Sequence, residues 1–352
     1  MTLASTRPAA KGWCPDAYRP MASGDGLILR LRPRFGTLSP AQFSLLADLA
    51  EQFCHGQIEL TSRGSLQLRG LSAEDIAPLQ EALRAAGLID SNPQTEAKRS
   101  AIFASHASAP QADATIAAFY ARLDELPDLP AKFCFGFDFT GLDQLGLDAC
   151  DIVIRHPEPN AIDAAIETAH WFMRTGGAEV KRMRHHDALH SAPSPIAPPT
   201  SHTPQVGHGT QTIAAAPFGL LSSATLRALG AAAYVRFCYG RRILIEGTAP
   251  QGSDLITDPS HPLLRVHCCA GAPQCTAAQI ETRRFAAQIA EASTGTLHIS
   301  GCAKGCAYPH TADVTLVGQN GAFDLVRGGY PWDEPHETGL SAEDILSREE
   351  LT

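Results

Sequence analysis

An internal repeat constrains the fold of this 352-residue chain more than any other feature of its sequence. Residues 35–50 and residues 218–233 align without a gap, and both stretches begin with Phe-Gly. The identical pairs are Phe35 and Phe218, Gly36 and Gly219, Leu38 and Leu221, Ser39 and Ser222, Ala41 and Ala224, Leu46 and Leu229, and Ala50 and Ala233. In each copy the serine is placed to cap a helix whose apolar residues recur at helical spacing. The repeat therefore predicts two pseudo-equivalent halves.

Strand and helix patterns alternate on both sides of each repeat. The expected strands are 26–32, 57–60, 65–68, 132–139, 151–155, 211–216, 242–246, 296–300, 314–317 and 323–326. Helical spacing predicts further helices at 112–126, 161–174 and 277–292. The dipeptide Asn320-Gly321 is typical of the turn of a two-residue hairpin. This mixture of hairpins and helices predicts an α+β fold.

The charge balance excludes several classes of protein. The chain has 28 Lys and Arg residues against 37 Asp and Glu residues, which gives a formal charge of −9. A binder of nucleic acid or of an anionic membrane needs a basic surface, so we expect neither partner. The sequence contains no apolar run long enough to span a bilayer and no apolar signal segment near its start. We therefore expect a cytoplasmic protein.

Four of the ten cysteines are grouped at metal-ligand spacing. Cys269 and Cys275 form a C-x5-C motif, and Cys302 and Cys306 form a C-x3-C motif after the next predicted helix and strand. Sulfur ligands select zinc or an iron–sulfur cluster. Because structural zinc usually takes closer pairs, the wide first motif favours a [4Fe–4S] cluster, with structural zinc and no metal as alternatives. Cys268 lies outside this register, and we do not expect it to be a ligand.

These motifs resemble the cluster signature of the nitrite/sulfite reductase superfamily. The matching residues are Cys269, Pro273 and Cys275, followed by the run Gly301-Cys302-Ala-Lys-Gly305-Cys306. The resemblance covers residues 20–330, and within the superfamily Ser300–Pro309 and Thr315–Gly329 most resemble the precorrin-3B synthases. It implies a pseudo-two-fold architecture with two ferredoxin-like half-domains and two larger α/β halves. The implied segments are 1–90 and 206–260 (half-domains), 91–186 (first α/β domain), 187–205 (Pro-rich linker), 261–335 (cluster domain) and 336–352 (tail).

Basic residues at strand ends are candidates for binding a tetrapyrrole that carries many carboxylates. Arg30, Arg32 and Arg34 alternate along the first strand and its exit, which places all three on one face. Further candidates are Arg63, Arg69, Lys98, Arg99, Lys132 and Lys304. The superfamily resemblance implies active-face roles for Arg63 of Thr61-Ser-Arg63, for Arg99, and for Lys132 as the first lysine of a K-F-K pattern. The second lysine of that pattern is replaced by Cys134, which weakens the case for six-electron reduction of sulfite.

Three functions fit these features. The first is an oxygen-dependent monooxygenase that hydroxylates precorrin-3A and closes a lactone, as the resemblance implies, with a [4Fe–4S] cluster and a mononuclear non-haem iron. In this interpretation the catalytic residues are Arg63, Arg99 and Lys132, and Arg32 and Lys304 help to bind the ligand. The second is a siroheme-dependent sulfite or nitrite reductase in which Cys306 bridges the cluster to the haem iron. The third is an electron-carrier module without enzymatic activity. The sequence contains neither a dinucleotide fingerprint nor a Walker A motif, so we expect a separate electron-donor protein.

Overall fold

The computed structural model describes residues 8, 14–99, 102–104, 110–139, 145–193, 197, 202–348 and 351. The chain divides into two compact units. The larger unit contains Trp13–Met21 and Ile28–Thr257, and the C-terminal unit contains Asp258–Thr352 together with the short segment Ala22–Leu27. Within the described residues, no helix is long and apolar enough to cross a membrane.

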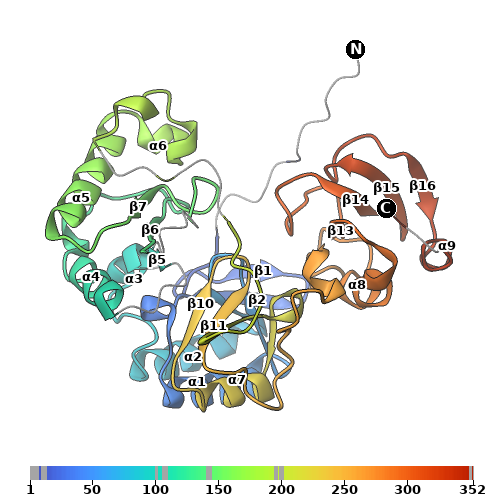
Figure 1. Cartoon of the computed structure of the whole chain (residues 1–352), viewed down its shortest axis with the longest axis horizontal. Helices are drawn as coiled ribbons and strands as arrows, with labels where there is room; N and C mark the ends of the chain where they lie inside the picture. Colours follow the sequence, from blue (N-terminus) through green and yellow to red (C-terminus); the bar gives the residue numbers. More distant parts are fainter. Residues whose placement is uncertain are drawn as a thin grey trace. The chain divides into compact units, whose positions relative to one another are not determined.

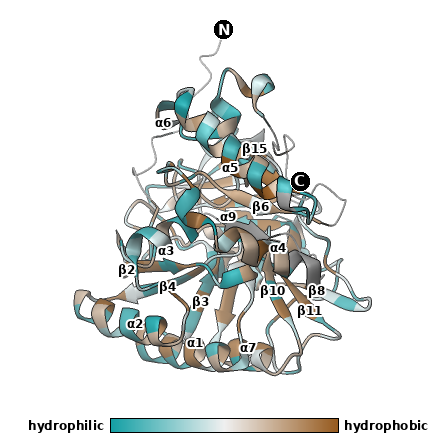
Figure 2. Cartoon of the chain, turned by 90° about the vertical axis from the view of Figure 1, so that its left-hand side faces the viewer, coloured by the Kyte–Doolittle hydropathy of each residue, from teal (hydrophilic) through white to brown (hydrophobic). Residues whose placement is uncertain are grey.

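Two half-domains built from the repeats form the base of the larger unit. The first sheet has the order β1-β2-β4-β3-β9, with β1 (Met21–Ser23), β2 (Gly26–Leu31), β3 (Gln57–Leu60), β4 (Leu66–Leu71) and β9 (Leu220–Ser222). The second has the order β10-β11-β8, with β8 (Gln211–Ala215), β10 (Val235–Cys238) and β11 (Arg242–Glu246). Helices α1 (Pro40–Phe53), α2 (Ala73–Ala85) and α7 (Ser223–Gly230) lie side by side against one side of these strands (Figure 1). The strands β10 and β11 are mostly hydrophobic, as expected for the covered layer (Figure 2).

The two copies of the repeat have the same backbone conformation. Phe35 and Phe218 have φ values of 57° and 55°, and the glycines after them have φ values of 71° and 82°. The side chain of Ser39 caps α1 and that of Ser222 caps α7. Strand β9 of the second copy pairs antiparallel with β3 of the first, with Gln57 opposite Ser222. The predicted repeat is therefore confirmed, and the two copies share one sheet.

A parallel three-stranded sheet with the order β5-β6-β7 forms the rest of the larger unit. Its strands are β5 (Ile102–Ala104), β6 (Phe135–Phe137) and β7 (Ile152–Ile154), and its helices are α3 (Pro93–Arg99), α4 (Pro110–Tyr120), α5 (Pro159–Arg174) and α6 (Gly177–Val180). Aromatic residues dominate its core, and Phe119, Phe133 and Phe172 are each buried there. The helix predicted for 112–126 ends at Tyr120 and is followed by a separate 3-10 turn at Leu123–Glu125.

The C-terminal unit is a five-stranded sheet with the order β12-β13-β14-β15-β16. Its elements are β12 (Val266–Cys268), β13 (Leu297–Ser300), β14 (Ala312–Gln319), β15 (Ala322–Gly329), β16 (Glu337–Leu340), α8 (Arg283–Ile289) and α9 (Ala342–Leu346). Asn320 and Gly321 both have positive φ values, 51° and 79°, and turn the predicted hairpin. The segment 336–352, which the sequence leaves as a tail, contains β16 and α9.

The Pro-rich segment predicted as a linker is partly described. Leu189–Ser191 form a 3-10 turn, whereas residues 194–196 and 198–201 lie outside the described part. The fold as a whole is α+β with the predicted pair of repeated half-domains and two further sheets, which confirms the expected fold class.

Candidate functional site

The four predicted cluster cysteines lie in two loops at one edge of the C-terminal sheet. Cys269 directly follows β12, and Cys302 comes two residues after β13 ends. Because β12 and β13 are parallel neighbours, their carboxyl ends meet at the same edge. Cys275 and Cys306 follow in the same two loops. Cys269, Cys275 and Cys302 are half-buried and Cys306 is exposed, whereas Cys268 is buried within β12.

Backbone groups and neighbouring thiols surround these sulfurs. The N–H of Gly301 donates a hydrogen bond to Sγ of Cys269 at 3.2 Å. Burial raises the pKa of the Cys302 thiol, and the nearby Cys269 and Cys275 thiols raise it further. At least three of the four sulfurs therefore interact electrostatically. Several sulfur ligands with N–H donors aimed at them fit an iron–sulfur cluster.

A single metal ion fits the described residues less well. Among them, no group of three or more His, Cys, Asp or Glu side chains is arranged closely enough to hold one ion. A cubane cluster is larger than one ion and keeps its sulfur ligands farther apart, so this finding does not count against the four cysteines as cluster ligands. It does leave the expected mononuclear iron without a described set of ligands.

Long-range contacts hold the Cys269–Cys275 loop. The N–H of Gly24 donates to the carbonyl of Gln274 at 3.0 Å, and Ser23 Oγ donates to the same carbonyl at 2.5 Å. The hydroxyl of Thr282 donates to the carbonyl of Cys269 at 2.6 Å. The N–H groups of Ala278 and Gln279 also bond to the cysteine loops, at 3.0 Å to Cys275 and 2.9 Å to Gly301. These loop contacts explain why the helix predicted for 277–292 is wrong at its start and α8 begins at Arg283.

Three of the predicted arginines interact with one another in the larger unit. Arg32 is buried, and its Nη2 donates to Ser65 Oγ at 3.0 Å. Arg30 is half-buried and its Nε donates to Gln67 Oε1 at 3.0 Å. Burial lowers the pKa of Arg30, and the positive charges of Arg32 and Arg63 lower it further. We call Arg30, Arg32 and Arg63 the arginine cluster.

Arg99 is buried near this cluster and already has an anionic partner. Its Nη2 lies 2.7 Å from Glu96 Oε2, and both side chains are 1% exposed. Its Nε and Nη1 have no hydrogen-bond partner among the described residues. Burial raises the pKa of Tyr120 to about 12 although Arg99 and Arg32 both oppose the rise, so these two guanidinium groups and the phenol are close. Arg99 therefore offers two free donor atoms in this region.

The other predicted basic residues have different surroundings. Lys132 is exposed, and Lys304 is half-buried in the C-terminal unit. Arg34 follows β2 rather than lying in it, and its guanidinium is 3.6 Å from Asp90. Arg69 pairs with Glu59 at 3.4 Å, and Lys98 donates to the carbonyl of Leu126 at 3.0 Å. The structure thus brings Arg30, Arg32 and Arg63 together, and the charge of Arg34 acts on Tyr120 as those of Arg32 and Arg99 do.

Further charged residues, which the sequence did not predict as part of the site, lie close to the arginine cluster. Arg182 and Asp151 form a buried ion pair at 2.9 Å. Arg184 lies close enough to Arg63 for the two charges to interact, and together with burial and Arg182 this lowers the pKa of Arg184. Arg182 and Arg184 sit in the run Lys181-Arg182-Met-Arg184, a basic signal that could have been noted.

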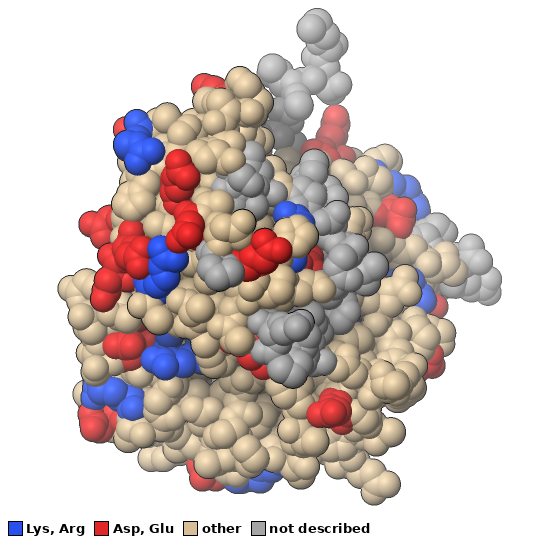
Figure 3. Space-filling model, turned by 60° about the vertical axis from the view of Figure 1, so that its left-hand side comes forward, with Lys and Arg blue, Asp and Glu red and all other residues tan. Residues whose placement is uncertain are grey.

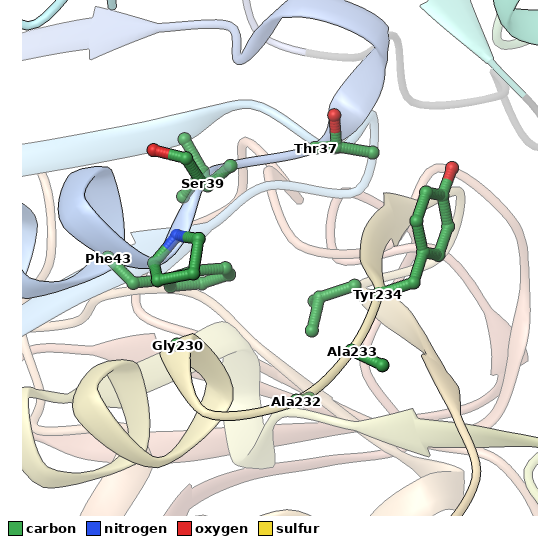
Figure 4. A pocket seen from close by; sticks show the side chains of 10 residues that line it. Thr37, Ser39, Phe43, Gly230, Ala232, Ala233 and Tyr234 are labelled. Carbon is green, nitrogen blue, oxygen red and sulfur yellow. The ribbon is translucent and has the colours of Figure 1, made fainter.

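A separate pocket of about 310 Å³ lies between the segment that leads into α1 and the segment that follows α7 (Figure 4). Its lining residues are Thr37, Leu38, Ser39, Pro40, Phe43, Gly230, Ala232, Ala233, Tyr234 and Val235. None of the predicted site residues lines it. On the face shown in Figure 3, Lys and Arg side chains are scattered among Asp and Glu rather than gathered in one patch, in keeping with the negative net charge.

Known proteins with a similar sequence or fold belong to the nitrite/sulfite reductases and the precorrin-3B synthases. Residues 19–86 match the model of the nitrite/sulfite reductase ferredoxin-like half domain. The structure of the NirA protein of Mycobacterium tuberculosis superposes with a TM-score of 0.58 at 17% identity, covering 86% of this chain and 74% of that one. A ferredoxin–nitrite reductase of Leptolyngbya laminosa is 35% identical over 77 residues, which are 22% of this chain and 15% of that protein.

These matches define the fold as that of the nitrite/sulfite reductases. A precorrin-3B synthase of a Sinorhizobium species is similar over a much larger part of the sequence. It is 28% identical over 401 aligned positions, which cover 93% of this chain and 84% of the relative. The resemblance predicted from the cysteine motifs is therefore confirmed, and the relatives are enzymes of this superfamily.

Proposed function

We propose that this chain is a precorrin-3B synthase, which hydroxylates precorrin-3A with O₂ and closes a lactone on the product. The observation that carries the proposal is the arginine cluster, found in a chain of net charge −9 that is similar over 93% of its length to a precorrin-3B synthase. An acidic protein gains affinity for a polycarboxylate only where its cations are concentrated. Arg30, Arg32 and Arg63 meet this requirement because they interact with one another in the folded chain.

The described residues have distinct roles in this proposal. Arg63 is half-buried and binds an acetate or propionate arm of the macrocycle. Arg99 keeps its ion pair with Glu96, and its two remaining donor atoms, which are buried, must become accessible if they are to reach the ligand. Tyr120, with its pKa raised to about 12, holds its phenolic proton at neutral pH and acts as a hydrogen-bond donor. Lys132 and Lys304 remain proposed carboxylate-binding residues.

Cys269, Cys275, Cys302 and Cys306 would hold a [4Fe–4S] cluster, which supplies one-electron transfer from an external donor protein when it is bound. The N–H of Gly301 stabilises negative charge at Cys269 Sγ. We derive no step through a mononuclear iron, because the described residues offer no group of three ligands for one.

The second candidate is a siroheme-dependent nitrite or sulfite reductase. It is supported by the match to the ferredoxin–nitrite reductase over 77 residues. The same arginine cluster would bind the carboxylates of siroheme, because both tetrapyrroles carry acid arms. Cys134 argues for the synthase: it stands where the reductase pattern has a second lysine, and it is buried beside Arg32 and Arg63.

The decisive experiment incubates the cluster-loaded protein with precorrin-3A, a reductase system and ¹⁸O₂. We expect ¹⁸O in the product, together with a strict need for reductant. Uptake of siroheme with consumption of nitrite or sulfite, and an unlabelled macrocycle, would support the second candidate instead.

Binding measurements with Arg63→Ala test the carboxylate site separately. A charge-assisted hydrogen bond is worth roughly 1.5–3 kcal/mol, so we expect tetrapyrrole affinity to fall by about 10- to 100-fold. Arg122→Ala removes the same charge from an exposed ion pair with Glu125 and is the matched control. Equal affinities in both variants would contradict the carboxylate site.

A further inference from the structure

Two buried cysteines face each other in the larger unit. Cys134 directly precedes β6, and Cys150 lies two residues before β7. Because β6 and β7 are adjacent parallel strands, with Phe135 opposite Ile152, the two thiols come from neighbouring strand ends. Their Sγ atoms are 4.0 Å apart, and the residues are 2% and 0% exposed. The sequence gives no sign of this pair, because the two cysteines are separated by fifteen unremarkable positions and form no known motif.

The two thiols differ in charge preference. A hydrogen bond from Cys150 lowers the pKa of Cys134 to about 6, and the positive charges of Arg32 and Arg63 lower it further. Burial and the same contact raise the pKa of Cys150. The opposite shifts of the two pKa values favour a thiolate on Cys134 beside a protonated Cys150 near neutral pH. This is the combination of a nucleophilic and a resolving cysteine.

A rigid frame positions the pair. The carboxylate of Asp151 accepts from the N–H of Cys134 at 2.9 Å and from Arg182 Nε at 2.9 Å, and the N–H of Asp151 donates to the carbonyl of Cys134 at 2.7 Å. Gly136 leaves room for the second sulfur, since a Cβ at this position would lie 3.0 Å from Cys150 Sγ. Neighbouring strands about 4.8 Å apart are within the range that a disulfide spans.

We propose that Cys134 and Cys150 form a redox-active dithiol that a peroxide converts reversibly to a disulfide. The Cys134 thiolate attacks one peroxide oxygen, so that an S–O bond forms, the O–O bond breaks and water leaves after protonation. The Cys150 sulfur then attacks the Cys134 sulfur, so that the S–S bond forms, the S–O bond breaks and a second water leaves with the Cys150 proton. The two thiols lose two electrons in total, and the peroxide gains them. The proposal does not depend on the tetrapyrrole reaction.

Simple packing does not explain this arrangement. Cys238 shows what an ordinary buried cysteine looks like in this chain: it is fully buried, its Sγ contacts the carbonyl of Arg236 at 3.4 Å, and burial raises its pKa to about 12. Cys134 is equally enclosed, and its Sγ also contacts a carbonyl, that of Phe135 at 3.5 Å, but it has in addition a second sulfur and two guanidinium groups near it.

The test uses the full-length, cluster-loaded protein exposed to hydrogen peroxide and then quenched, denatured, alkylated and digested with trypsin. Cleavage after Lys132 and Arg155 leaves both cysteines in the single peptide 133–155. We expect this peptide to escape alkylation and to have a mass lower by two hydrogen atoms, and we expect a dithiol reductant to reverse the change. A peptide that remains fully alkylated after peroxide treatment of the folded protein would overturn the proposal.

Three variants distinguish the roles of the two thiols. Cys150→Ser should stop at a sulfenic acid on Cys134 that dimedone traps, whereas Cys134→Ser should leave Cys150 reduced. Cys238→Ser is the control and should form the disulfide as the unmodified chain does. Oxidation of Cys238 at the same rate as Cys134 would show general exposure to oxidant and would contradict a dedicated pair.

The pH dependence gives an independent readout. The groups that face Cys134 are Cys150, Arg32, Arg63 and Asp151. With a pKa near 6, the rate of disulfide formation should rise as pH increases through about 6 and level off near neutrality. A rate that keeps rising to the ordinary thiol value of about 8.5 would contradict the assigned thiolate.

Discussion

Cys268 and Cys269 are neighbours in the chain, yet the structure places their side chains in different surroundings. Cys268 is the last residue of β12 and is 1% exposed within the sheet. Cys269 is half-buried in the following loop, where the N–H of Gly301 bonds to its sulfur at 3.2 Å. A sulfur inside the sheet layer cannot turn to the loop edge without breaking the register between β12 and β13.

We therefore predict that Cys268→Ala retains its iron and sulfide content and that Cys269→Ala loses most of both. Alanine is a small apolar residue suited to the buried position, so the Cys268 variant should fold. Iron and sulfide analysis after anaerobic reconstitution, with circular dichroism as the check on folding, measures the difference. Loss of iron from the Cys268 variant alone would show that the ligand register is wrong.

Spacing in the sequence grouped the four cysteines that lie in two neighbouring loops of the structure, but it could not rank the arginines. Alternation correctly placed Arg30 on the face of β2 opposite the buried Leu29 and Leu31, whereas Arg32 directly follows the strand. The strand was expected to end at Arg32 and ends one residue earlier, at Leu31. The buried pair of Arg99 with Glu96 follows from helical i,i+3 spacing, a local signal that had been available. The contact between Cys134 and Cys150 depends on strand pairing, which no local pattern indicates.

At the scale of elements, the Phe-Gly turn of each repeat determines how the half-domains meet. Gly219 has a φ of 82°, and a Cβ there would collide with the carbonyl oxygen of Leu60 in β3. Gly247 has nearly the same φ, 80°, but a Cβ there would meet nothing within 4 Å. Substitutions at these two positions therefore distinguish two contributions to the free energy of unfolding: backbone strain, which both share, and steric overlap, which occurs at Gly219 only.

We predict that Gly247→Ala lowers the free energy of unfolding by about 1 kcal/mol, the strain of a left-handed alanine. Gly219→Ala should cost about 2 kcal/mol more, because the Leu60 carbonyl belongs to a paired strand and cannot move freely. Urea denaturation of both variants measures this difference. Equal losses would mean that the two half-domains separate more easily than the pairing of β3 with β9 implies.

Periodicity predicted the bounds of several strands and of one helix end correctly. Strands β3 and β11 begin and end where expected, and α5 ends at the predicted Arg174. The helix predicted for 277–292 was wrong at its start for an identifiable reason: Ala278 and Gln279 give their N–H groups to the cysteine loops. The spacing of apolar residues does not show when carbonyls elsewhere in the chain accept the N–H groups that a helix would need.

At the scale of the whole molecule, the first hairpin of the chain supports the cluster loop near its other end. The turn at Ser23 and Gly24 belongs to the C-terminal unit and bonds to Gln274, next to Cys275. The repeat predicted two related halves, but it did not indicate the contact between the turn at Gly24 and Gln274, because these residues lie outside the repeated stretches. The chain therefore closes on itself through a contact that only the folded structure reveals.

This contact leads to a final prediction. A Cβ at Gly24 would overlap the carbonyl oxygen of Pro273 and would lie 3.1 Å from the N–H nitrogen of Cys275. Gly24→Ala should therefore displace the Cys269–Cys275 loop and release iron to a chelator several-fold faster than the unmodified protein. Gly207→Ala is the matched control, because a Cβ there meets nothing within 4 Å and neither glycine has a positive φ. If both variants release iron at the unmodified rate, the hairpin does not support the Cys269–Cys275 loop, and its other contacts, such as those with Thr282, Gly301 and Ala278, are enough to hold it.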